Sequence, residues 1–163
     1  MSGYLYVLDT SAILARKLNI FSPEYVTTPS VMQEIRLGKI SRLTGYSSGI
    51  LSVQDPTPES REKVRKAAAD TGDLGELSPT DLDVMALALD LGISVVSDDY
   101  AIQNVSRYLG IGVSGAELSE IGKEITWRYR CTGCGKIYAK NMGNCAVCGH
   151  SLKRSVRSYK IVK

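Results

Sequence analysis

The sequence predicts an α/β domain built on a mainly parallel sheet, followed by a small, separate C-terminal module of β structure. Two observations lead to this fold class. Short apolar runs that suit strands alternate with helical patterns through most of the 163 residues, and parallel neighbours require such crossover connections. All four cysteines, by contrast, fall in the last 39 residues, with nine Lys and Arg and no Asp or Glu. We therefore expect two domains, residues 1–122 and 123–163.

The order of elements in the first domain follows from apolar runs and from helix-start signals. Strands are expected at residues 4–8, 25–28, 50–53 and 93–97, and helices at 12–15, 29–37, 59–69, 79–91 and 100–109. The strongest helix start is Ser78-Pro79-Thr80-Asp81, where Ser78 is the predicted N-cap and Asp81 occupies the capping-box position. Residues 110–124 are expected to hold a last short strand and the linker to the second domain.

Acidic residues stand in four places that suggest one pocket. Asp9 follows the first strand, Asp98 and Asp99 follow a late strand, and Glu34 and Asp81 lie in helices. Ligands of parallel sheets collect beyond the carboxyl ends of the strands, and carboxylate oxygens are the usual ligands of Mg²⁺ and Mn²⁺. A divalent ion held there can lower the pKa of a bound water and orient it on a phosphodiester. The pattern therefore predicts hydrolytic nuclease chemistry.

Each acid also has a structural interpretation, and the joint placement is what favours the pocket. Asp9 and Asp81 suit helix caps, and Glu34 suits a solvated helix face. Asp83 lies about 200° around a helix from Asp81, so only one of the two can face the pocket well. The first domain has no histidine or cysteine, which excludes a mechanism built on a His pair. Attack by a metal-activated water would leave a 3′-hydroxyl. A phosphotransferase with Asp9 as nucleophile is disfavoured because position 11 is Ser.

The cysteines form two Cys-x-x-Cys pairs separated by ten residues, and each pair is followed by glycine. Two such turns can aim four thiolates at one tetrahedral, structural zinc ion. The alternative is a pair of disulfides, which the absence of an apolar N-terminal signal segment and the short spacing disfavour. His150 is expected to be an exposed imidazole outside the ligand set. The predicted zinc ligands are Cys131, Cys134, Cys145 and Cys148.

Charge is divided unequally, with −6 up to Glu124 and +9 after it. A cationic segment of this kind attracts polyanions, chiefly nucleic acid. No apolar run approaches the roughly 20 residues of a membrane span, so we expect a soluble, intracellular protein without a membrane partner.

Trp127-Arg128-Tyr129-Arg130 alternates aromatic rings and guanidiniums. In a strand these side chains would stack on bases or bind phosphates; alternatively the two rings form the core of the small module. The predicted RNA-binding residues are Trp127, Arg128, Tyr129, Arg130, Lys136, Lys140, Lys153, Arg154 and Arg157.

Four segments together resemble a PIN domain: residues 7–12, 29–34, 77–84 and 95–100, in the order of that family. Residues 101–105 and the terminal ribbon narrow the resemblance to the Nin-one-binding endonucleases, in a compact archaeal form. This resemblance implies a PIN-like parallel sheet with helices on both faces and a C-terminal β zinc ribbon. It implies catalytic roles for Asp9, Glu34, Asp81, Asp98 and Asp99, with Asp9, Asp81 and Asp99 as Mg²⁺ or Mn²⁺ ligands.

The resemblance also implies a substrate. The family cuts small-subunit (16S) rRNA precursors to produce the mature 3′ end, so the expected partners are single-stranded or structured pre-rRNA, the small-subunit precursor and ribosome assembly factors, in the cytoplasm. Two other functions stay open. One is a zinc-ribbon assembly factor that binds rRNA with little cleavage. The other is a toxin-like PIN ribonuclease, against which the basic ribbon argues.

Overall fold

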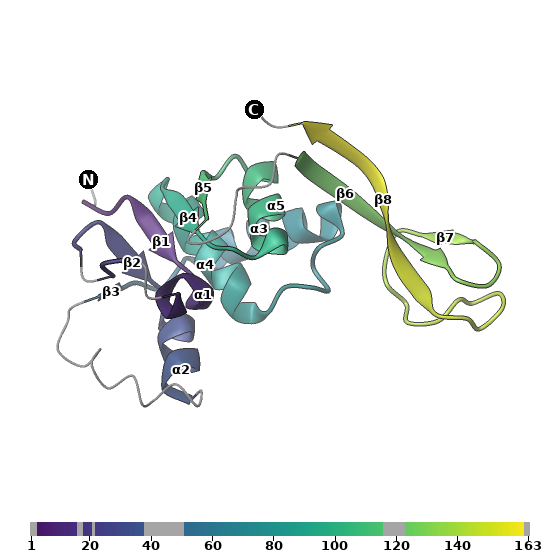
Figure 1. Ribbon diagram of the computed structural model, residues 1–163, viewed down its shortest axis with the longest axis horizontal. Helices are drawn as coiled ribbons and strands as arrows, with labels where there is room; N and C mark the ends of the chain where they lie inside the picture. The colour runs from purple at the N-terminus through teal and green to yellow at the C-terminus, as the bar shows by residue number, and fades with distance from the viewer. Residues whose placement is uncertain (1–2, 16–17, 21, 38–50, 116–122, 162–163) are drawn as a thin grey trace.

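A computed structural model of the chain describes residues 3–15, 18–20, 22–37, 51–115 and 123–161. It contains a five-stranded parallel sheet in the order β3-β2-β1-β4-β5 and a three-stranded antiparallel sheet in the order β7-β6-β8 (Figure 1). The predicted fold class is confirmed. The parallel strands are β1 Tyr6–Leu8, β2 Tyr25–Thr27, β3 Ser52–Val53, β4 Ser94–Val96 and β5 Val113–Ser114. The helices are α1 Thr10–Leu14, α2 Pro29–Leu37, α3 Pro58–Thr71, α4 Pro79–Leu91 and α5 Tyr100–Tyr108.

Local sequence signals set the helix ends. Ser78 caps α4 and forms the predicted capping box with Asp81, and Gly92 closes the helix in the left-handed region at φ 64°. Helix α3 runs to Thr71, two residues past its predicted end at 69, because the chain turns only at Gly72, at φ 82°. Ile50, the first residue of a predicted strand, lies outside the described residues, as do 116–122 before the predicted domain boundary.

The core of the first domain lies between the parallel sheet and α4. Five consecutive residues of this helix, 84–88, are fully buried, and the helix contacts β1, β4, α2 and α3. A helix that is apolar on all sides is buried on all sides. Val7, Val26 and Val95 from three neighbouring strands are likewise fully buried. No helix among the described residues combines the length and the apolar character needed to cross a bilayer.

The strand order decides where the acidic loops meet. β1 is central and pairs with β4 in parallel, with Leu8 opposite Val96. The two strands therefore end side by side, and the Asp9 backbone N–H donates to the carbonyl of Val96 at 3.3 Å. Segments 88 residues apart in sequence thus share one edge of the sheet.

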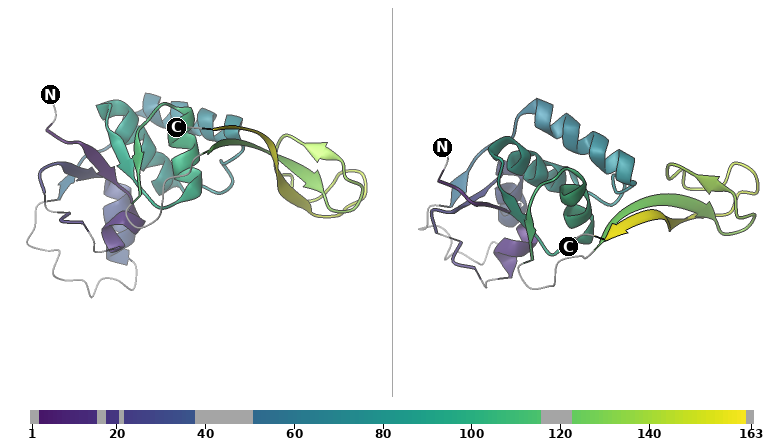
Figure 2. Two further views of the ribbon diagram at one scale, coloured as in Figure 1. Left: turned by 45° about the horizontal axis from the view of Figure 1, so that its top comes forward. Right: turned by 90° about the horizontal axis from the view of Figure 1, so that it is seen from above.

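The second sheet is a long, twisted hairpin of β6 Lys123–Cys131 and β8 Leu152–Ile161, to which β7 Ile137–Tyr138 is added. It projects from the α/β domain and carries the cysteine-containing turns at its far end (Figures 1 and 2). The near part of β6 contacts α3 and α5. We call this antiparallel sheet with its cysteine turns, residues 123–161, the ribbon.

Candidate functional site

Asp9 is the most deeply placed acid of the predicted pocket, with 4% of its surface exposed. Its carboxylate accepts hydrogen bonds from the Ala12 backbone N–H at 2.7 Å, from the Ser11 hydroxyl at 2.9 and 3.0 Å, and from the Ser97 hydroxyl at 2.5 Å. Burial raises the pKa of Asp9 above 3.8; these hydrogen bonds oppose the rise and the neighbouring Asp81 adds to it. Asp9 is therefore an N-cap of α1 and also a member of an acidic group.

Ser97 joins the two strand ends. Its buried hydroxyl donates to Asp9 and accepts from the Asp99 backbone N–H at 3.1 Å, and its carbonyl accepts from the Gln103 side chain at 2.9 Å. Asp99 in turn caps α5 through Oδ1, which accepts from the N–H groups of Ala101 and Ile102. Ser11 and Ser97 thus both hold the carboxylate of Asp9 by hydrogen bonds.

Asp81 connects Asp9 to the remaining acids. Its pKa is raised above 3.8, first by burial and then by the charges of Asp99 and Glu34. Glu34, on α2, accepts a hydrogen bond from Thr10 at 2.7 Å. The structure therefore brings Asp9, Glu34, Asp81 and Asp99 close enough to interact electrostatically, from four different elements.

Asp83 has other partners. It accepts hydrogen bonds from the Ser30 hydroxyl at 2.9 Å and from Arg61 Nε at 2.7 Å, so that it ties α4 to α2 and α3. Its charge is paired within the fold. This arrangement supports the choice of Asp81 over Asp83 for the pocket.

Asp98 and Asp99 also border a recess of about 400 Å³, whose other lining residues are Glu76, Tyr100, Ala101 and Arg154. Arg154 belongs to β8, so the ribbon forms one wall of this recess. The recess lies next to the acidic group because Asp99 belongs to both.

The acidic group offers the oxygen donors that Mg²⁺ and Mn²⁺ prefer. Buried carboxylates that raise one another's pKa are a poor arrangement without a cation, which favours a bound divalent ion at this place. Within the described ranges, only the four thiols form a set of three or more ligand side chains gathered within 4.8 Å. The carboxylates are more widely spaced than that.

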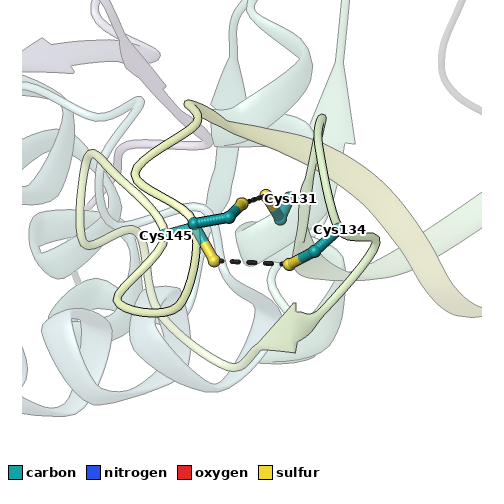
Figure 3. Close-up of side chains that lie close together, drawn as sticks. Cys131, Cys134 and Cys145 are labelled. Atoms are coloured by element: carbon teal, nitrogen blue, oxygen red, sulfur yellow. Dashed lines mark hydrogen bonds between the residues drawn. The ribbon is translucent and has the colours of Figure 1, made fainter.

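The four cysteines are free thiols gathered at the end of the ribbon. Sγ of Cys131 lies 3.3 Å from that of Cys148, and Sγ of Cys134 lies 3.6 Å from that of Cys145. Figure 3 shows the side chains of Cys134 and Cys145 pointing toward each other. Sulfurs bound at about 2.3 Å to one tetrahedral zinc stand roughly 3.8 Å apart. The cluster therefore fits a single ion of this type.

The two turns that carry the cysteines are alike. Gly133 N–H donates to Cys131 Sγ at 3.3 Å and Val147 N–H to Cys145 Sγ at 3.4 Å. The glycine after each pair has a φ of 75°, which L side chains rarely adopt. Glycine therefore suits the position at which the chain turns after each pair of cysteines.

Two side chains next to the thiols complete the centre. The Tyr138 hydroxyl accepts from Ala146 N–H at 3.2 Å and therefore donates to Cys145 Sγ, 3.1 Å away, which lowers the pKa of Cys145 to about 5. His150 is exposed as expected, and its Nδ1 lies 3.1 Å from the Cys148 carbonyl oxygen. The Tyr138 bond thus favours the thiolate form of Cys145, which is the form that binds a metal ion.

Strand register gives the ribbon two different faces. Arg130 lies opposite Lys153 and Arg128 opposite Ser155, and alternation places these four side chains on one face, here called the basic face. Of the other predicted RNA-binding residues, Lys136, Lys140 and Arg157 are exposed. The expected separation of guanidiniums from aromatic rings is therefore present.

The opposite face packs on the first domain. Tyr129 is 5% exposed and Trp127 contacts Gly72, where an added Cβ would lie 3.0 Å from the Trp127 Cβ. The Arg154 guanidinium lies 4.4 Å from the centre of the Trp127 ring and pairs with Asp73. This is a correction to both interpretations of the rings, because they form neither a free stacking surface nor a core of the ribbon alone. We leave Tyr129 and Arg154 out of the proposed RNA-binding surface.

Sequence reasoning missed two residues at this contact, Asp73 and Asn104. Both are almost fully buried, at 1% and 3% exposed. The available signals were weak: Asp73 stands in a Gly- and Asp-rich loop, and Asn104 interrupts the apolar residues Ile102 and Val105 of α5. Only the position of the ribbon shows what they bind.

Comparison with known proteins agrees with the fold. A family model described as the PIN domain of ribonuclease matches residues 6–91, from β1 to the end of α4. PAE2754 from Pyrobaculum aerophilum, a solved structure, shares the fold with a TM-score of 0.50 at 20% identity, over 71% of this chain and 91% of its own.

Relatives extend the match through the ribbon. Endoribonuclease Nob1 of Archaeoglobus fulgidus is 40% identical over 96% of this chain and 94% of its own length. Ribonuclease VapC1 of Thermoplasma acidophilum is 43% identical over 93% of this chain and 78% of its length. The 20S-pre-rRNA D-site endonuclease nob1 of Schizosaccharomyces pombe is 33% identical over 60% of this chain and 26% of its length.

Acids at the ends of parallel strands, joined to a basic ribbon with four gathered thiols, define a metal-dependent endoribonuclease. The chain belongs to the PIN-domain ribonuclease family, within the group of the archaeal Nob1 endoribonucleases.

Proposed function

We propose that this endoribonuclease cuts the small-subunit (16S) rRNA precursor to produce its mature 3′ end, in the cytoplasm. The observation that carries the nuclease part is the electrostatic coupling of Asp9, Glu34, Asp81 and Asp99 at one edge of the sheet. The rRNA substrate is supported by the Nob1 relatives, one of which is named for a pre-rRNA site. We propose the two domains to be residues 1–122 and 123–163.

Asp9, Asp81 and Asp99 would hold Mn²⁺ or Mg²⁺, with Glu34 and Asp98 beside them. When bound, such an ion supplies a water of lowered pKa and neutralises charge on the phosphodiester. The protein's own contribution is orientation. Ser11, Ser97 and the Ala12 N–H fix the carboxylate of Asp9, and the capping bond from Ser78 N–H fixes Oδ2 of Asp81 at 2.7 Å. A zinc ion held by the four cysteines would fix the ribbon turns.

The basic face would bind the RNA backbone. Like charges directly opposite one another destabilise an antiparallel pair, yet Arg130 faces Lys153 across β6 and β8. A phosphate between them would relieve that repulsion, and the exposed side chains of Lys136, Lys140 and Arg157 would extend the contact. Polyanion binding is therefore the role that explains this pairing. Ribosome assembly factors are the further partners we propose.

The test is cleavage of an end-labelled RNA that spans the 3′ end of small-subunit rRNA, with Mn²⁺ or with EDTA, beside Asp9→Asn. A single cut at the mature end that requires both metal and Asp9 would support the proposal. Binding without a cut would instead indicate an assembly factor. Equal cutting of unrelated RNAs would indicate a nuclease without this rRNA as its target.

A further inference from the structure

Three polar side chains join the ribbon to the first domain, and we call them the clamp: Asp73, Asn104 and Arg154. Asp73, just after α3, accepts hydrogen bonds from Arg154 Nη2 and from Asn104 Nδ2, the latter at 2.7 Å. Asn104, on α5, also donates to the carbonyl of Ile125 and accepts from its N–H, both at 2.6 Å. One side chain thus satisfies both backbone groups of a residue in β6.

The geometry of the clamp fixes direction as well as position. Ile125, Trp127 and Tyr129 are alternate residues of β6. Each contacts the first domain: Ile125 through its backbone at Asn104, and Trp127 and Tyr129 at Gly72. Three successive contacts along a strand define a line. A single contact would leave the ribbon free to rotate about it.

The charges make the arrangement specific. A carboxylate that is 1% exposed is costly unless it is paired and hydrogen-bonded. Arg154 supplies the positive charge that pairs with Asp73, and its guanidinium stacks on the ring of Trp127, which itself lies against Gly72. Displacing the ribbon would therefore leave Asp73 without its charged partner, and Asn104 without the backbone of Ile125.

The clamp also brings the ribbon to the catalytic edge. Arg154 lines the recess of about 400 Å³ together with Asp98 and Asp99. The basic face lies on the other side of the same two strands, with Lys153 next to Arg154 in sequence. The distance from the acids to the basic face is consequently set by the contacts of the clamp.

We propose that Asp73 and Asn104 are positioning residues for RNA cleavage. By holding β6 on the first domain they keep the basic face at a fixed distance from the acidic group, so the cut falls a fixed number of nucleotides from the RNA held by that face. The proposal rests on the proposed endoribonuclease function. It assigns the choice of cleavage position to a contact between the domains.

The test uses the full chain and the variant Asn104→Asp, which keeps the side-chain shape but sets a carboxylate against Asp73 and the Ile125 carbonyl. Asp73→Asn is a milder second variant that removes the charge facing Arg154. Asp90→Asn is the matched control, because Asp90 accepts three hydrogen bonds from Thr57 and Ser60 within the first domain. A general loss of stability would affect the control in the same way.

Residual dipolar couplings test whether the clamp holds the two domains in one fixed orientation. Wild type and Asp90→Asn should fit one alignment tensor for both domains, and Asn104→Asp should require two. A shared tensor in Asn104→Asp and in Asp73→Asn, or separate tensors in wild type, would refute the clamp.

Cleavage of a long, end-labelled rRNA tests whether the clamp determines the position of the cut. In Asn104→Asp the cuts should spread over neighbouring positions and the main cut should slow roughly tenfold or more, because orientation is lost. Cutting of an RNA too short to reach the basic face should keep its rate. A variant with two tensors and an unchanged single cut would overturn the positioning role alone, whereas absence of cleavage in wild type would overturn the proposed function.

Discussion

The Ser97 hydroxyl donates a 2.5 Å hydrogen bond to the carboxylate of Asp9, across the ends of two neighbouring parallel strands. The same hydroxyl accepts from the Asp99 N–H. One buried, uncharged serine therefore binds the carboxylate of one acid of the site and the backbone of another.

Replacing that serine should change the pH dependence of cleavage. The Ser97 bond lowers the pKa of Asp9, so Ser97→Ala should raise that pKa further. The acid limb of the pH–rate profile should move to higher pH, with activity at neutral pH reduced about tenfold or more. Ser60→Ala is the control, because Ser60 likewise donates to a carboxylate, that of Asp90, outside the acidic group. An unshifted acid limb in Ser97→Ala would contradict this role.

Charge at Asp9 should cost stability in the metal-free protein. Its folded pKa is raised above 3.8, so folding favours the protonated form, and stability is lost as pH rises from the ordinary value through the raised one. Asp9→Asn should lack this loss and should melt a few degrees higher near pH 7, at about 2–4 °C for each kcal/mol regained. Thermal melts from about pH 4 to about pH 8 check this. A wild-type protein as stable as Asp9→Asn at every pH would exclude it.

Arg130 and Lys153, two positive charges that face each other on the basic face, should lower the stability of the ribbon and raise its affinity for RNA. Lys153→Ala removes one partner of the Arg130–Lys153 pair, so unfolding should become roughly 0.2–1 kcal/mol less favourable. RNA affinity should fall, and the slope of log K against log salt should decrease by about 0.7 for each lost phosphate contact. Salt titrations of RNA binding measure this. Tyr129→Phe, on the opposite face, should leave the slope unchanged.

Removing the zinc ion that we propose for the four thiols should unfold the ribbon turns and spare the α/β domain. Small structural zinc sites contribute about 10–16 kcal/mol of apparent binding energy at neutral pH, most of it needed for folding. With a strong chelator, or in Cys148→Ser, amide signals from residues 131–151 should collapse while those of 84–88 persist. Ser151→Ala, next to the cluster but outside it, should keep both sets. Collapse of the α/β signals would show that the two parts fold together.

The space around Gly133 should be too small for a larger side chain. A Cβ there would lie 2.7 Å from the His150 ring and 3.2 Å from Cys148 Sγ, so Gly133→Ala should destabilise the ribbon by about 1–3 kcal/mol. Adding His150→Ala should restore most of that loss, as measured by unfolding in denaturant. If the double variant were no better than Gly133→Ala, the imidazole would not be the obstacle.

Local signals predicted the parts of the site that depend on single elements. Asp9, Asp81 and Asp99 stand at strand ends or helix starts, and each is an N-cap or a capping-box residue. One position can both cap a helix and contribute to the site, because the N-terminus of a helix that follows a parallel strand lies at the edge of the sheet where ligands bind. The Cys-x-x-Cys pairs predicted the thiol cluster for a similar reason, since each pair is one turn.

The contact between the domains could not be predicted from the sequence. Arg154 and Asp73 are 81 residues apart, and Asn104 meets the backbone of Ile125, not a side chain whose type could indicate it. The absence of acids near Arg154 in the sequence suggested a free cation, but its acid belongs to the other domain. Tyr129 was misplaced for the same reason, because a strand pattern shows which residues share a face and not what covers that face.

The pairing of Asp73 with Arg154 also has a consequence for biosynthesis. Chains fold from the N-terminus as they are made, so the parallel sheet with its acids is complete before the ribosome has added Arg154. Until then Asp73 and the Gly72 surface stay open, and the nascent protein has its cutting residues without its cationic face. A chain released early would therefore carry the acids but lack the cationic face with which to hold RNA.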